Sequence, residues 1–427
     1  MAVSALSEPL SLLTEQAIAP LQQAGLIDDP WSRGVHRISG EPVVLSLATA
    51  AALAEAACAV AMMLDHAVQA IAGDPQLVSD LGLSPSLAAL AQLDAPRWLA
   101  LARADVFLVP GQLPQVCEIN CDTPTGLAEC TELGRVAVAA ATAAAESRPA
   151  FSDPSARLRE RWLTMVRSCV VGDHRGAVVG LIDATEMTED LGHVRLLSRW
   201  LHDDGFTVVR GSPFNLHACP GQRVGLFGVP CAMLIRHYKT DWWAERSSPW
   251  SDEPPPPAAT CLTREIALIA EAMAAGTVAV LNPWGAAFGQ SKRTLALPWE
   301  RPDLFSAAIQ DATRRHLPET RFLSSLSVEQ LHAEREKWVL KSDFGCEGDE
   351  VVMGSLTTAE AWMTAVRLAD PQRWVVQRAF TPELDRDGFI VNHGVFLIGG
   401  MPSGIFSRRS RGPTDDRALA SPTLVAT

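Results

Sequence analysis

The sequence predicts a mixed α+β protein with a doubly wound α/β unit in its middle. Three observations predict this class: helix-spaced apolar residues dominate the first third, strands and a helix alternate in the middle third, and short strands joined by Gly-rich turns fill the last third. A chain of 427 residues with 48% hydrophobic content can bury a large core in two or three structural units. We place these units at residues 1–150, 170–260 and 275–427.

The first third is predicted to be helical around one β-hairpin. The apolar run Val43–Leu64 is interrupted by Glu55, which favours a buried helix over a membrane span of about 20 apolar residues. The turn-forming stretch PGQLP separates two strand-like runs, which indicates a hairpin. The expected helices are Pro42–Ala72, Pro85–Leu101 and Gly134–Ala145, and the expected hairpin strands are Arg103–Val109 and Gln115–Asn120.

The middle third has the alternation of a βαβ unit. It predicts a small doubly wound sheet from Asp173 to about Trp243. Four consecutive prolines in SSPWSDEPPPPAAT exclude a helix interior or a central strand, so we expect a surface loop or linker after this unit. The expected elements are the strands Gly176–Asp183, Phe206–Arg210, Arg223–Phe227 and Ala232–Arg236 and the helix Val194–Asp204.

The last third predicts an antiparallel sheet, because its strands lie close in sequence and are joined by short Gly-rich turns. One helix is expected at Ser291–Leu297. The expected strands are Val278–Leu281, Lys337–Lys341, Val351–Met353, Trp374–Gln377, Ile390–Ile398 and Gly404–Ser407.

The composition limits the classes of partner. A formal charge of −13 repels a polyphosphate backbone, which argues against nucleic acid. The N-terminus lacks the basic start and apolar core of a secretory signal, so we expect a cytoplasmic protein without a membrane partner. Nine irregularly spaced cysteines favour free thiols over disulfides, and the group Cys117, Cys121 and Cys130 lacks the second half of a zinc site.

The strongest chemical signal is the segment EINCDTPTG together with the strand before it. If the hairpin places Asp105 opposite Glu118, Arg103 then faces Asn120. Magnesium takes oxygen ligands, usually carboxylates plus nucleotide phosphates, and Arg103 would neutralise a transferring phosphoryl group. The alternative is the solvated face of an ordinary hairpin, and one residue of slip would separate the two carboxylates.

The segment WVLKSDFGCEGDEVVM places Lys341 at the end of a strand and Gly345 and Gly348 in the following loop. Glycines let backbone amides approach an anion, and the lysine supplies a positive charge for phosphate. Because the lysine precedes the glycines, this is not a Walker A loop. The alternative is a plain β-turn.

Two further groups of cations stand out. Lys292 follows Ser291, which we interpret as a helix N-cap, and a lysine at that end opposes the helix dipole. This placement hints at a ligand-facing role, with an ordinary surface lysine as the alternative. Near the C-terminus Arg408, Arg409 and Arg411 form a basic run that suits phosphate or carboxylate, or else a solvated surface.

Taken in order, these segments resemble the synthetase part of the glutathionylspermidine synthase family, from roughly Trp98 to the C-terminus. That family has an Arg, an Asp two residues later and an ExNxDTPT-like segment, which Arg103, Asp105 and Glu118–Thr125 match. A Ser-Lys helix ending in WE, a Lys-ended strand with a Gly loop, a strand ending in Gln377 and a GxxxGIxxR-like segment follow in the family's order.

The resemblance implies a circularly permuted ATP-grasp fold with a central Rossmann-like pre-ATP-grasp unit. The first unit would carry the metal-binding hairpin and the last unit the nucleotide. ATP would phosphorylate a carboxylate, and an amine would displace phosphate to leave an amide and ADP. The implied residues are Asp105, Glu118 and Asn120 for Mg²⁺, Lys292, Lys341, Gly345, Gly348 and Gln377 for ATP, Arg103 and Arg408 for catalysis, and Thr123 and Thr125 for substrate.

The chain also departs from the family pattern. It is too short at its N-terminal end for the amidase domain of bifunctional members, and its FGCEG loop lacks the family's Arg, which weakens glutathione as the acid. Members that use polyamines place acidic residues in the central unit, which Glu186, Glu189 and Asp190 would match unless they mark a helix N-terminus. The expected partners are a small-molecule carboxylate and an amine.

The sequence also leaves two other classes of function. The main alternative is an ATP-binding regulatory or scaffold protein without ligase activity. A dinucleotide-dependent oxidoreductase is disfavoured, because GAVVGLIDATE lacks GxGxxG after its strand.

Overall fold

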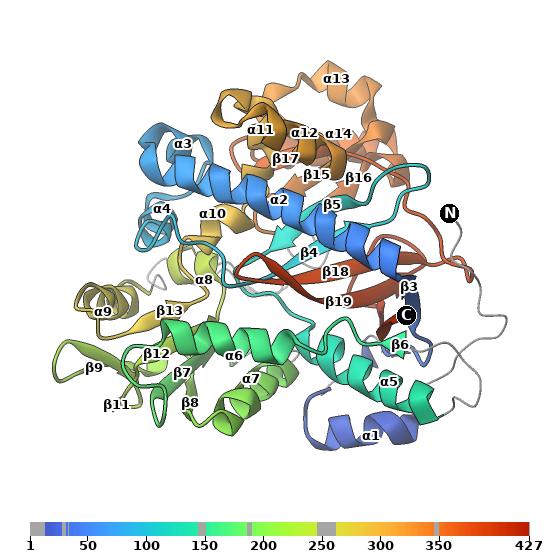
Figure 1. Cartoon of the computed structure of the whole chain (residues 1–427). Helices are drawn as coiled ribbons and strands as arrows, with labels where there is room; N and C mark the ends of the chain where they lie inside the picture. Colours follow the sequence, from blue (N-terminus) through green and yellow to red (C-terminus); the bar gives the residue numbers. More distant parts are fainter. Residues whose placement is uncertain are drawn as a thin grey trace.

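Three larger sheets organise the molecule (Figure 1): one of five antiparallel strands, one of four antiparallel strands and one of four parallel strands. This is a mixed α/β architecture with several sheets. The computed structural model describes residues 13–27, 31–32, 34–143, 151–185, 190–245, 262–345 and 350–426.

The five-stranded sheet joins segments from the two ends of the chain. Its order is β20-β19-β18-β4-β5, so the hairpin of the first third pairs directly with strands near the C-terminus. β4 is buried along its whole length, because it lies between β5 and β18. The strands are β4 (Leu101–Phe107), β5 (Gln115–Asn120), β18 (Ile390–Ile398), β19 (Met401–Ser410) and β20 (Leu419–Ser421).

Helix α2 (Leu47–Gly73) packs against this sheet. Ser46 caps its N-terminus by accepting a hydrogen bond from the Thr49 amide at 3.0 Å. Inner side chains such as Leu53 and Val60 are fully buried in one cluster with β4 and β5. Among the described helices α2 alone is long and apolar enough to cross a membrane, with a mean hydropathy of 1.9 over its most apolar window. Its packing confirms the predicted buried helix, but the predicted start at Pro42 is wrong, because Val43–Ser46 form the strand β3.

The parallel sheet has the order β13-β12-β7-β8, and α7 connects β7 to β8. This confirms the predicted βαβ unit. Two strands were predicted in the wrong sheet. The strand β10, expected in this unit, pairs with β9 and β11 in a separate antiparallel sheet. The strand β13, expected in the sheet of the last third, pairs with β12. The bounds are β7 (Val178–Asp183), α7 (Leu191–Asp203), β8 (Thr207–Gly211), β9 (Leu216–Cys219), β10 (Arg223–Leu226), β11 (Val229–Pro230), β12 (Met233–His237) and β13 (Ala279–Leu281).

The third sheet is antiparallel throughout, with the order β14-β17-β15-β16. The antiparallel pairing predicted for the last third is confirmed, but the single sheet is not, because β18 and β19 belong to the five-stranded sheet. Trp362 and Val366 of α14 pack in one cluster with Leu340 and Val376 of the sheet. The bounds are β14 (Thr320–Phe322), α13 (Val328–Ala333), β15 (Trp338–Ser342), β16 (Val351–Met353), α14 (Ala359–Leu368) and β17 (Trp374–Arg378).

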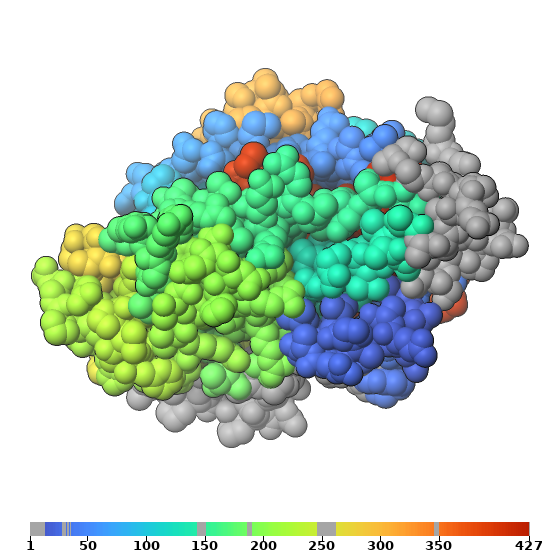
Figure 2. Space-filling model, turned by 60° about the horizontal axis from the view of Figure 1, so that its bottom comes forward, coloured from blue at the N-terminus to red at the C-terminus, as the bar shows by residue number. Residues whose placement is uncertain are grey.

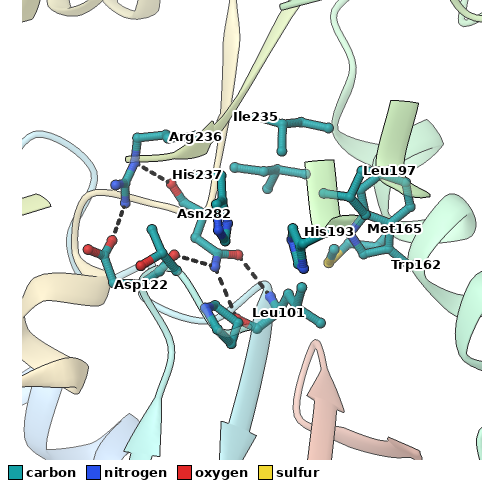
Figure 3. Close-up of a pocket in the computed structure, with 13 residues that line it drawn as sticks. Leu101, Asp122, Trp162, Met165, His193, Leu197, Ile235, Arg236, His237 and Asn282 are labelled. Carbon is teal, nitrogen blue, oxygen red and sulfur yellow. Dashed lines mark hydrogen bonds and ion pairs between the residues drawn. The ribbon is translucent and has the colours of Figure 1, made fainter. Parts of the chain in front are cut away.

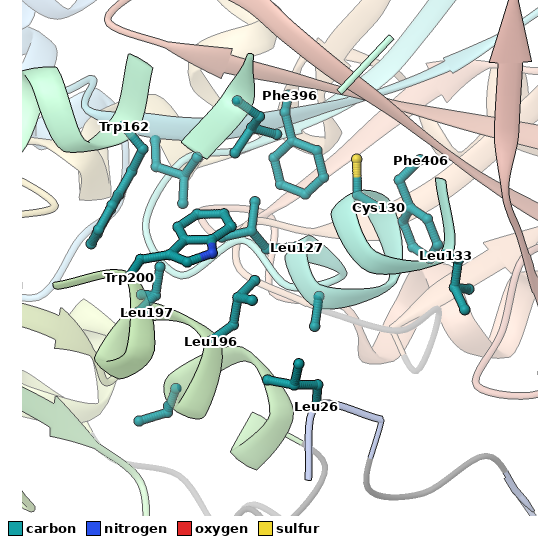
Figure 4. Close-up of a cluster of buried hydrophobic side chains, with 14 of the residues drawn as sticks. Leu26, Leu127, Cys130, Leu133, Trp162, Leu196, Leu197, Trp200, Phe396 and Phe406 are labelled. Carbon is teal, nitrogen blue, oxygen red and sulfur yellow. The ribbon is translucent and has the colours of Figure 1, made fainter. Parts of the chain in front are cut away.

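An apolar cluster joins the helices of the parallel sheet to the five-stranded sheet (Figure 4). Trp162 of α6 (Leu158–Cys169) and Trp200 of α7 have ring centroids 5.8 Å apart. Phe396 of β18 and Phe406 of β19 belong to the same cluster. Because buried aromatic side chains contribute large apolar areas, this cluster fixes α6 and α7 relative to the strands that carry the candidate site.

The first described segment lies against α7. A Cβ added at Gly192 would stand 2.4 Å from the Leu26 carbonyl oxygen, so this contact requires glycine. Figure 2 shows the segment in dark blue beside the green middle part of the chain. The remaining elements are α1 (Glu15–Gln23), β1 (Trp31–Ser32), β2 (Val35–His36), β3 (Val43–Ser46), α3 (Pro75–Asp80), α4 (Pro85–Ala91), α5 (Gly134–Ala143), β6 (Phe151–Ser152), α8 (Thr240–Ala244), α9 (Thr263–Ala274), α10 (Ala286–Gln290), α11 (Leu297–Glu300), α12 (Ala307–His316) and β21 (Thr423–Ala426).

The predicted helix Pro85–Leu101 is too long. Helix α4 ends at Ala91, and Leu101 already belongs to β4. Pro96 lies between them, and a proline both lacks a backbone donor and disfavours helix at the residue before it. The apolar residues after Ala91 have helix-like spacing but lie in a loop.

The predicted helix Ser291–Leu297 is also wrong. Ser291 ends α10 instead of capping a new helix, and its carbonyl accepts from the Thr294 amide in a short 3₁₀ turn. The next α-helix begins at Leu297 with Pro298 in its first turn, where proline is favoured. Lys292 therefore lies in a connection, and the argument from the helix dipole does not apply to it.

Candidate functional site

The hairpin pairs in the predicted register. Asp105 lies opposite Glu118, and Arg103 lies opposite Asn120. The register shifts only beyond Asp105, between it and Val106, so the bulge leaves the polar pairs in place. All four side chains therefore stand on two adjacent strands within two residue positions of each other.

Asp105 is the centre of a buried ion cluster. Its Oδ1 accepts from Nε of Arg103 at 2.8 Å, and its Oδ2 accepts from Nη2 of Arg408 at 2.7 Å. Asn392 of β18 donates its side-chain amide to the same Oδ2 at 3.4 Å. Gly394 lies opposite Asp105 on β18, and a Cβ there would stand 2.7 Å from Cδ of Arg103. Glycine at that position therefore leaves room for the arginine.

The two carboxylates of the hairpin stay ionised because cations surround them. Burial alone would raise the pKa of Asp105, but Arg103 and Arg408 outweigh it and lower the pKa to about 2. Burial likewise opposes ionisation of Glu118, and the neighbouring Lys292 lowers the pKa of that carboxyl below its usual value. Burial in turn lowers the pKa of Arg408.

Lys292 reaches the second carboxylate. Its Nζ lies 3.3 Å from Oε2 of Glu118 and donates to the Gly345 carbonyl at 2.8 Å. Asn120 donates to Oε1 of Glu118 at 3.4 Å and accepts from Gln290 at 3.3 Å. The Lys292 side chain is only 4% exposed, so it is not an ordinary surface lysine.

Lys341 and Gln377 lie together between β5 and the third sheet. The Lys341 ammonium donates to Oε1 of Gln377 at 2.8 Å and to the Cys117 carbonyl at 3.3 Å. Gln377 donates its amide to Oγ1 of Thr320 at 3.0 Å. Because Cys117 precedes Glu118, the ammonium of Lys341 stands next to the carboxylate cluster.

The loop after β15 is described only at its start. The Gly345 amide donates to Oγ of Ser342 at 2.9 Å. Gly348, predicted to complete the phosphate loop, lies outside the described residues, as do Glu186 and Glu189. The roles expected for these three residues therefore stay predictions.

The loop that follows β5 touches the arginine of the cluster. The Thr125 carbonyl accepts from Nη1 of Arg103 at 2.8 Å, and Thr125 Oγ1 lies 3.4 Å from the same nitrogen. Thr123 and Pro124 of the same loop line a pocket. Of the two threonines predicted to bind substrate, Thr125 contacts the ion cluster and Thr123 lines the pocket.

Asp122 anchors this loop to the parallel sheet. Its Oδ1 accepts from Nη2 of Arg236 and from Oγ1 of Thr240, both at 2.7 Å, and its Oδ2 accepts from the Thr240 amide at 2.6 Å. Arg236 also lies 4.3 Å from the Trp284 ring centroid. Figure 3 shows Arg236 between Asp122 and Asn282. This aspartate therefore positions the loop.

Only one arginine of the C-terminal basic run belongs to the site. Arg408 reaches Asp105, as described above. Arg409 pairs with Asp385 at 2.7 Å, and the guanidinium groups of Arg409 and Arg411 lie 4.6 and 4.3 Å from the Phe389 ring centroid. Alternation along β19 explains this split, because neighbouring residues of a strand point to opposite faces.

The oxygen donors present suit Mg²⁺. Asp105, Glu118 and Asn120 offer two carboxylates and one amide oxygen, which are ligand types that this ion takes together with nucleotide phosphates. The Oδ1 of Asn392 is a buried acceptor without a hydrogen-bond partner in the described structure, and it lies beside Asp105. Within the described ranges no group of three or more His, Cys, Asp and Glu residues could hold a metal, so phosphate oxygens would have to complete the shell.

Sequence reasoning missed Asn392, Gln290 and the partner of Asp122. Asn392 is one polar residue inside an apolar strand, and nothing in the sequence says which strand it faces. Gln290 carried a weak signal, since it directly precedes the Ser-Lys pair. Arg236 lies more than a hundred residues from Asp122, and only the folded sheets bring them together.

Comparison with solved structures identifies the fold. A glutathione synthetase-like effector of Globodera pallida, solved in its apo form, superimposes with a TM-score of 0.58 at 12% identity over 99% of each chain. A Methylobacillus flagellatus structure described as a gamma-glutamylcysteine synthetase gives a TM-score of 0.45 at 11% identity, over 85% of this chain and 84% of that one. No protein-family model and no curated protein sequence matches the chain. The chain has a glutathione synthetase-like fold.

Proposed function

We propose that this chain is an ATP-dependent carboxylate-amine ligase that forms an amide through an acyl phosphate. One observation carries the proposal: Arg103, Arg408 and Lys292 contact the two carboxylates of one hairpin, and Lys341 lies beside them. Phosphoryl transfer depends on positioned cations and metal ligands more than on a protein nucleophile. The glutathione synthetase-like fold supports the same class of chemistry.

The side chains take the following roles in this proposal. Arg103 and Arg408 stabilise the phosphoryl group as it moves to the substrate carboxylate. Thr123 and Thr125 contact that carboxylate, since their loop lies against Arg103. Lys292 and Lys341 hold the ATP phosphates, the Gly345 and Gly348 loop covers them, and Gln377 lies toward the base.

Asp105, Glu118 and Asn120 would hold Mg²⁺, and the buried oxygen of Asn392 would add a donor at the same place. Bound there, the ion would neutralise charge on the ATP phosphates. The protein's own contribution is to keep both carboxylates ionised and aligned on adjacent strands.

The second half of the reaction forms the amide. The amine nitrogen bonds to the acyl carbon while the bond from that carbon to the phosphate oxygen breaks. Phosphate leaves with the bonding pair, and the nitrogen gives up one proton to it. The products are an amide, ADP and phosphate.

We further propose the chain order of glutathionylspermidine synthase, that is, a circularly permuted ATP-grasp with a Rossmann-like pre-ATP-grasp unit in the middle. The pairing of β4 with β18 supports this proposal, because it unites a hairpin from the first third with strands near the C-terminus. The parallel sheet between them in sequence supports the central unit.

A screen for ADP release tests the proposal. Pairs of carboxylic acids (amino acids and small peptides) and amines (including polyamines) are incubated with ATP and Mg²⁺, and amide products are detected by mass. We expect at least one pair to give ADP and amide in equal amounts. ATP binding without turnover on any pair would contradict the ligase and leave an ATP-binding regulatory protein.

A further inference from the structure

A small pocket lies where the parallel sheet meets the loop after β5 (Figure 3). Thr123 and Pro124 line it from that loop, and His237 and Leu281 line it from the C-terminal ends of β12 and β13. Parallel sheets bind ligands at this end of their strands. The pocket also adjoins the ion cluster, because the Thr125 carbonyl next to Pro124 accepts from the cluster's arginine.

His193 of α7 presents an unpaired polar atom at this pocket. Its side chain lines the pocket, and the residue is only 6% exposed. Its Nδ1 is enclosed and has no hydrogen-bond partner among the described residues. Buried polar atoms in native proteins nearly always have partners, so an unpaired one at a pocket indicates a ligand that supplies the partner.

The surroundings of His193 keep its imidazole neutral. Its ring stacks on that of His237, with centroids 4.3 Å apart, and His237 lies 3.2 Å from the Asp190 carboxylate. Burial and the neighbouring His237 lower the pKa of His193 well below its usual value. A neutral imidazole carries one acceptor nitrogen, so it can receive an N–H from a ligand.

The rest of the pocket describes the ligand further. Asp122 is paired with Arg236, and it is the only carboxylate among the described residues that line the pocket. Trp162, Met165 and Leu197 form an apolar wall beside His193 (Figure 3). The cavity has a volume of about 20 Å³, which suits a ligand group of a few non-hydrogen atoms.

We propose that this pocket receives the amino group of the acceptor amine, which donates an N–H to Nδ1 of His193. The carbons next to the nitrogen then lie against Trp162 and Leu197. The assignment rests on the proposed ligase function. It names the second substrate as a primary amine that has no other charged group close to its reacting nitrogen. A polyamine would need a carboxylate as the partner of its further ammonium group. The described residues that line the pocket offer no carboxylate that is free for this role.

The test uses methylamine as the probe and two substitutions of one residue. His193→Phe keeps a ring to stack on His237 but removes the acceptor, whereas His193→Asn places an amide oxygen near the position of Nδ1. We expect kcat/KM for methylamine to fall roughly ten- to hundredfold in H193F and to stay within about threefold of wild type in H193N. His202→Asn, an exposed histidine on the same helix, is the matched control and should change nothing.

Two readouts separate this inference from the ligase function. Exchange of ¹⁸O between the bridging and non-bridging positions of labelled ATP, with the acid and without amine, measures acyl phosphate formation alone. Ligand-observed NMR measures methylamine affinity without the acid. We expect normal exchange and at least tenfold weaker methylamine binding in H193F, and the same weakening in Leu197→Phe, which narrows the pocket and keeps His193.

The outcomes are distinct. Methylamine that fails to bind the wild type, or that binds H193F and L197F as well as the wild type, would overturn the assignment. Methylamine binding that depends on His193, in a protein that exchanges no ¹⁸O with any acid, would support the pocket and contradict the ligase.

Discussion

At the scale of single residues, the site consists of largely buried carboxylates that are paired with largely buried cations. Asp105 holds Arg103 and Arg408, and Glu118 holds Lys292. A buried charge without its partner is costly, so each of these side chains keeps the others ionised and aligned. The charges of the site are therefore in position before the ATP and Mg²⁺ that we propose as its ligands bind.

Glu118 gives the first prediction. Glu118→Gln keeps the shape of the side chain but removes one of the two carboxylates proposed as metal ligands. ADP formation should fall roughly 100-fold or more. Circular dichroism and the melting temperature check that the variant is folded. A folded variant with near-normal turnover would show that this hairpin is not the metal site.

The two buried lysines give the second prediction. Lys292→Ala and Lys341→Ala each remove one cation from the proposed phosphate site, so ATP affinity should fall roughly tenfold or more in each variant. The control is Lys337→Ala, since Lys337 is exposed and pairs only with Glu334 among the described residues. Calorimetric titration with ATP measures all three. Equal ATP affinity in the two buried variants and the control would return these lysines to a structural role.

The site residues on the hairpin could be predicted from the sequence, and others could not. A strand has a period of two, so Asp105, Glu118 and Asn120 follow from one assumption about register, and that register is confirmed. Asn392 could not be found this way, because its neighbours in sequence say nothing about the strand that lies opposite. The assignment of Asp105, Glu118 and Asn120 as metal ligands stays a prediction.

At the scale of elements, the loop after β5 connects the ion cluster to the parallel sheet. Asp122 holds it to Arg236 and Thr240, while Thr125 holds it to Arg103. The loop therefore has little freedom between two rigid sheets. This rigidity suits the role that we propose for the loop, which is to present a substrate carboxylate to a phosphoryl group.

Asp122 gives the third prediction. Asp122→Asn leaves the guanidinium of Arg236, whose side chain is 1% exposed, without its counter-charge. The free energy of unfolding should fall by about 3 kcal/mol or more, measured by urea denaturation. Asp303→Asn is the control, because Asp303 pairs with Arg301 on the exposed surface and should change stability little. Equal stability of the D122N variant and the wild type would mean that the buried pair does not anchor the loop.

Elements with a strong local pattern were predicted well, and those with ambiguous ends were not. The run Gln115–Asn120 is bounded by turn residues, and its predicted bounds agree with β5. Ser291 carried the chemistry of an N-cap, but the Pro298 signal for the following helix start was the stronger one. The three-residue strand β13 has too little sequence to show its partner, and only its parallel pairing with β12 decides its place.

At the scale of the whole molecule, the site depends on contacts between distant parts of the chain. Asp105 lies on β4 in the first third of the chain, and its partner Arg408 lies on β19 near the C-terminus. In the sheet, β18 lies between these two strands. Such long-range pairing cannot be read from local patterns, although it decides which charges meet. The fold class and the order of motifs were accessible from the sequence, while the assembly of the five-stranded sheet was not.

His393, in the middle of this sheet, gives the fourth prediction. Burial lowers its pKa to about 4, against about 6.5 in the unfolded chain, so between these values the unfolded state binds a proton that the folded state does not. Stability should therefore be fully present above pH 6.5 and fall by about 3 kcal/mol as the pH drops to 4.

The measurement is urea denaturation at several pH values for the wild type and His393→Gln. The variant cannot take up this proton, so the difference in unfolding free energy between the two proteins should shrink as the pH falls. A difference that stays constant from pH 7 to pH 4 would contradict the buried neutral state of His393.

Trapping with hydroxylamine tests the central claim most directly. A carboxylate is a poor electrophile, and the cations of Arg103, Arg408, Lys292 and Lys341 suit its activation by phosphoryl transfer. With the correct acid, ATP and Mg²⁺, hydroxylamine in place of the amine should give a hydroxamate together with an equal amount of ADP. Formation of AMP and pyrophosphate instead of ADP would contradict the acyl phosphate, even if a hydroxamate were formed.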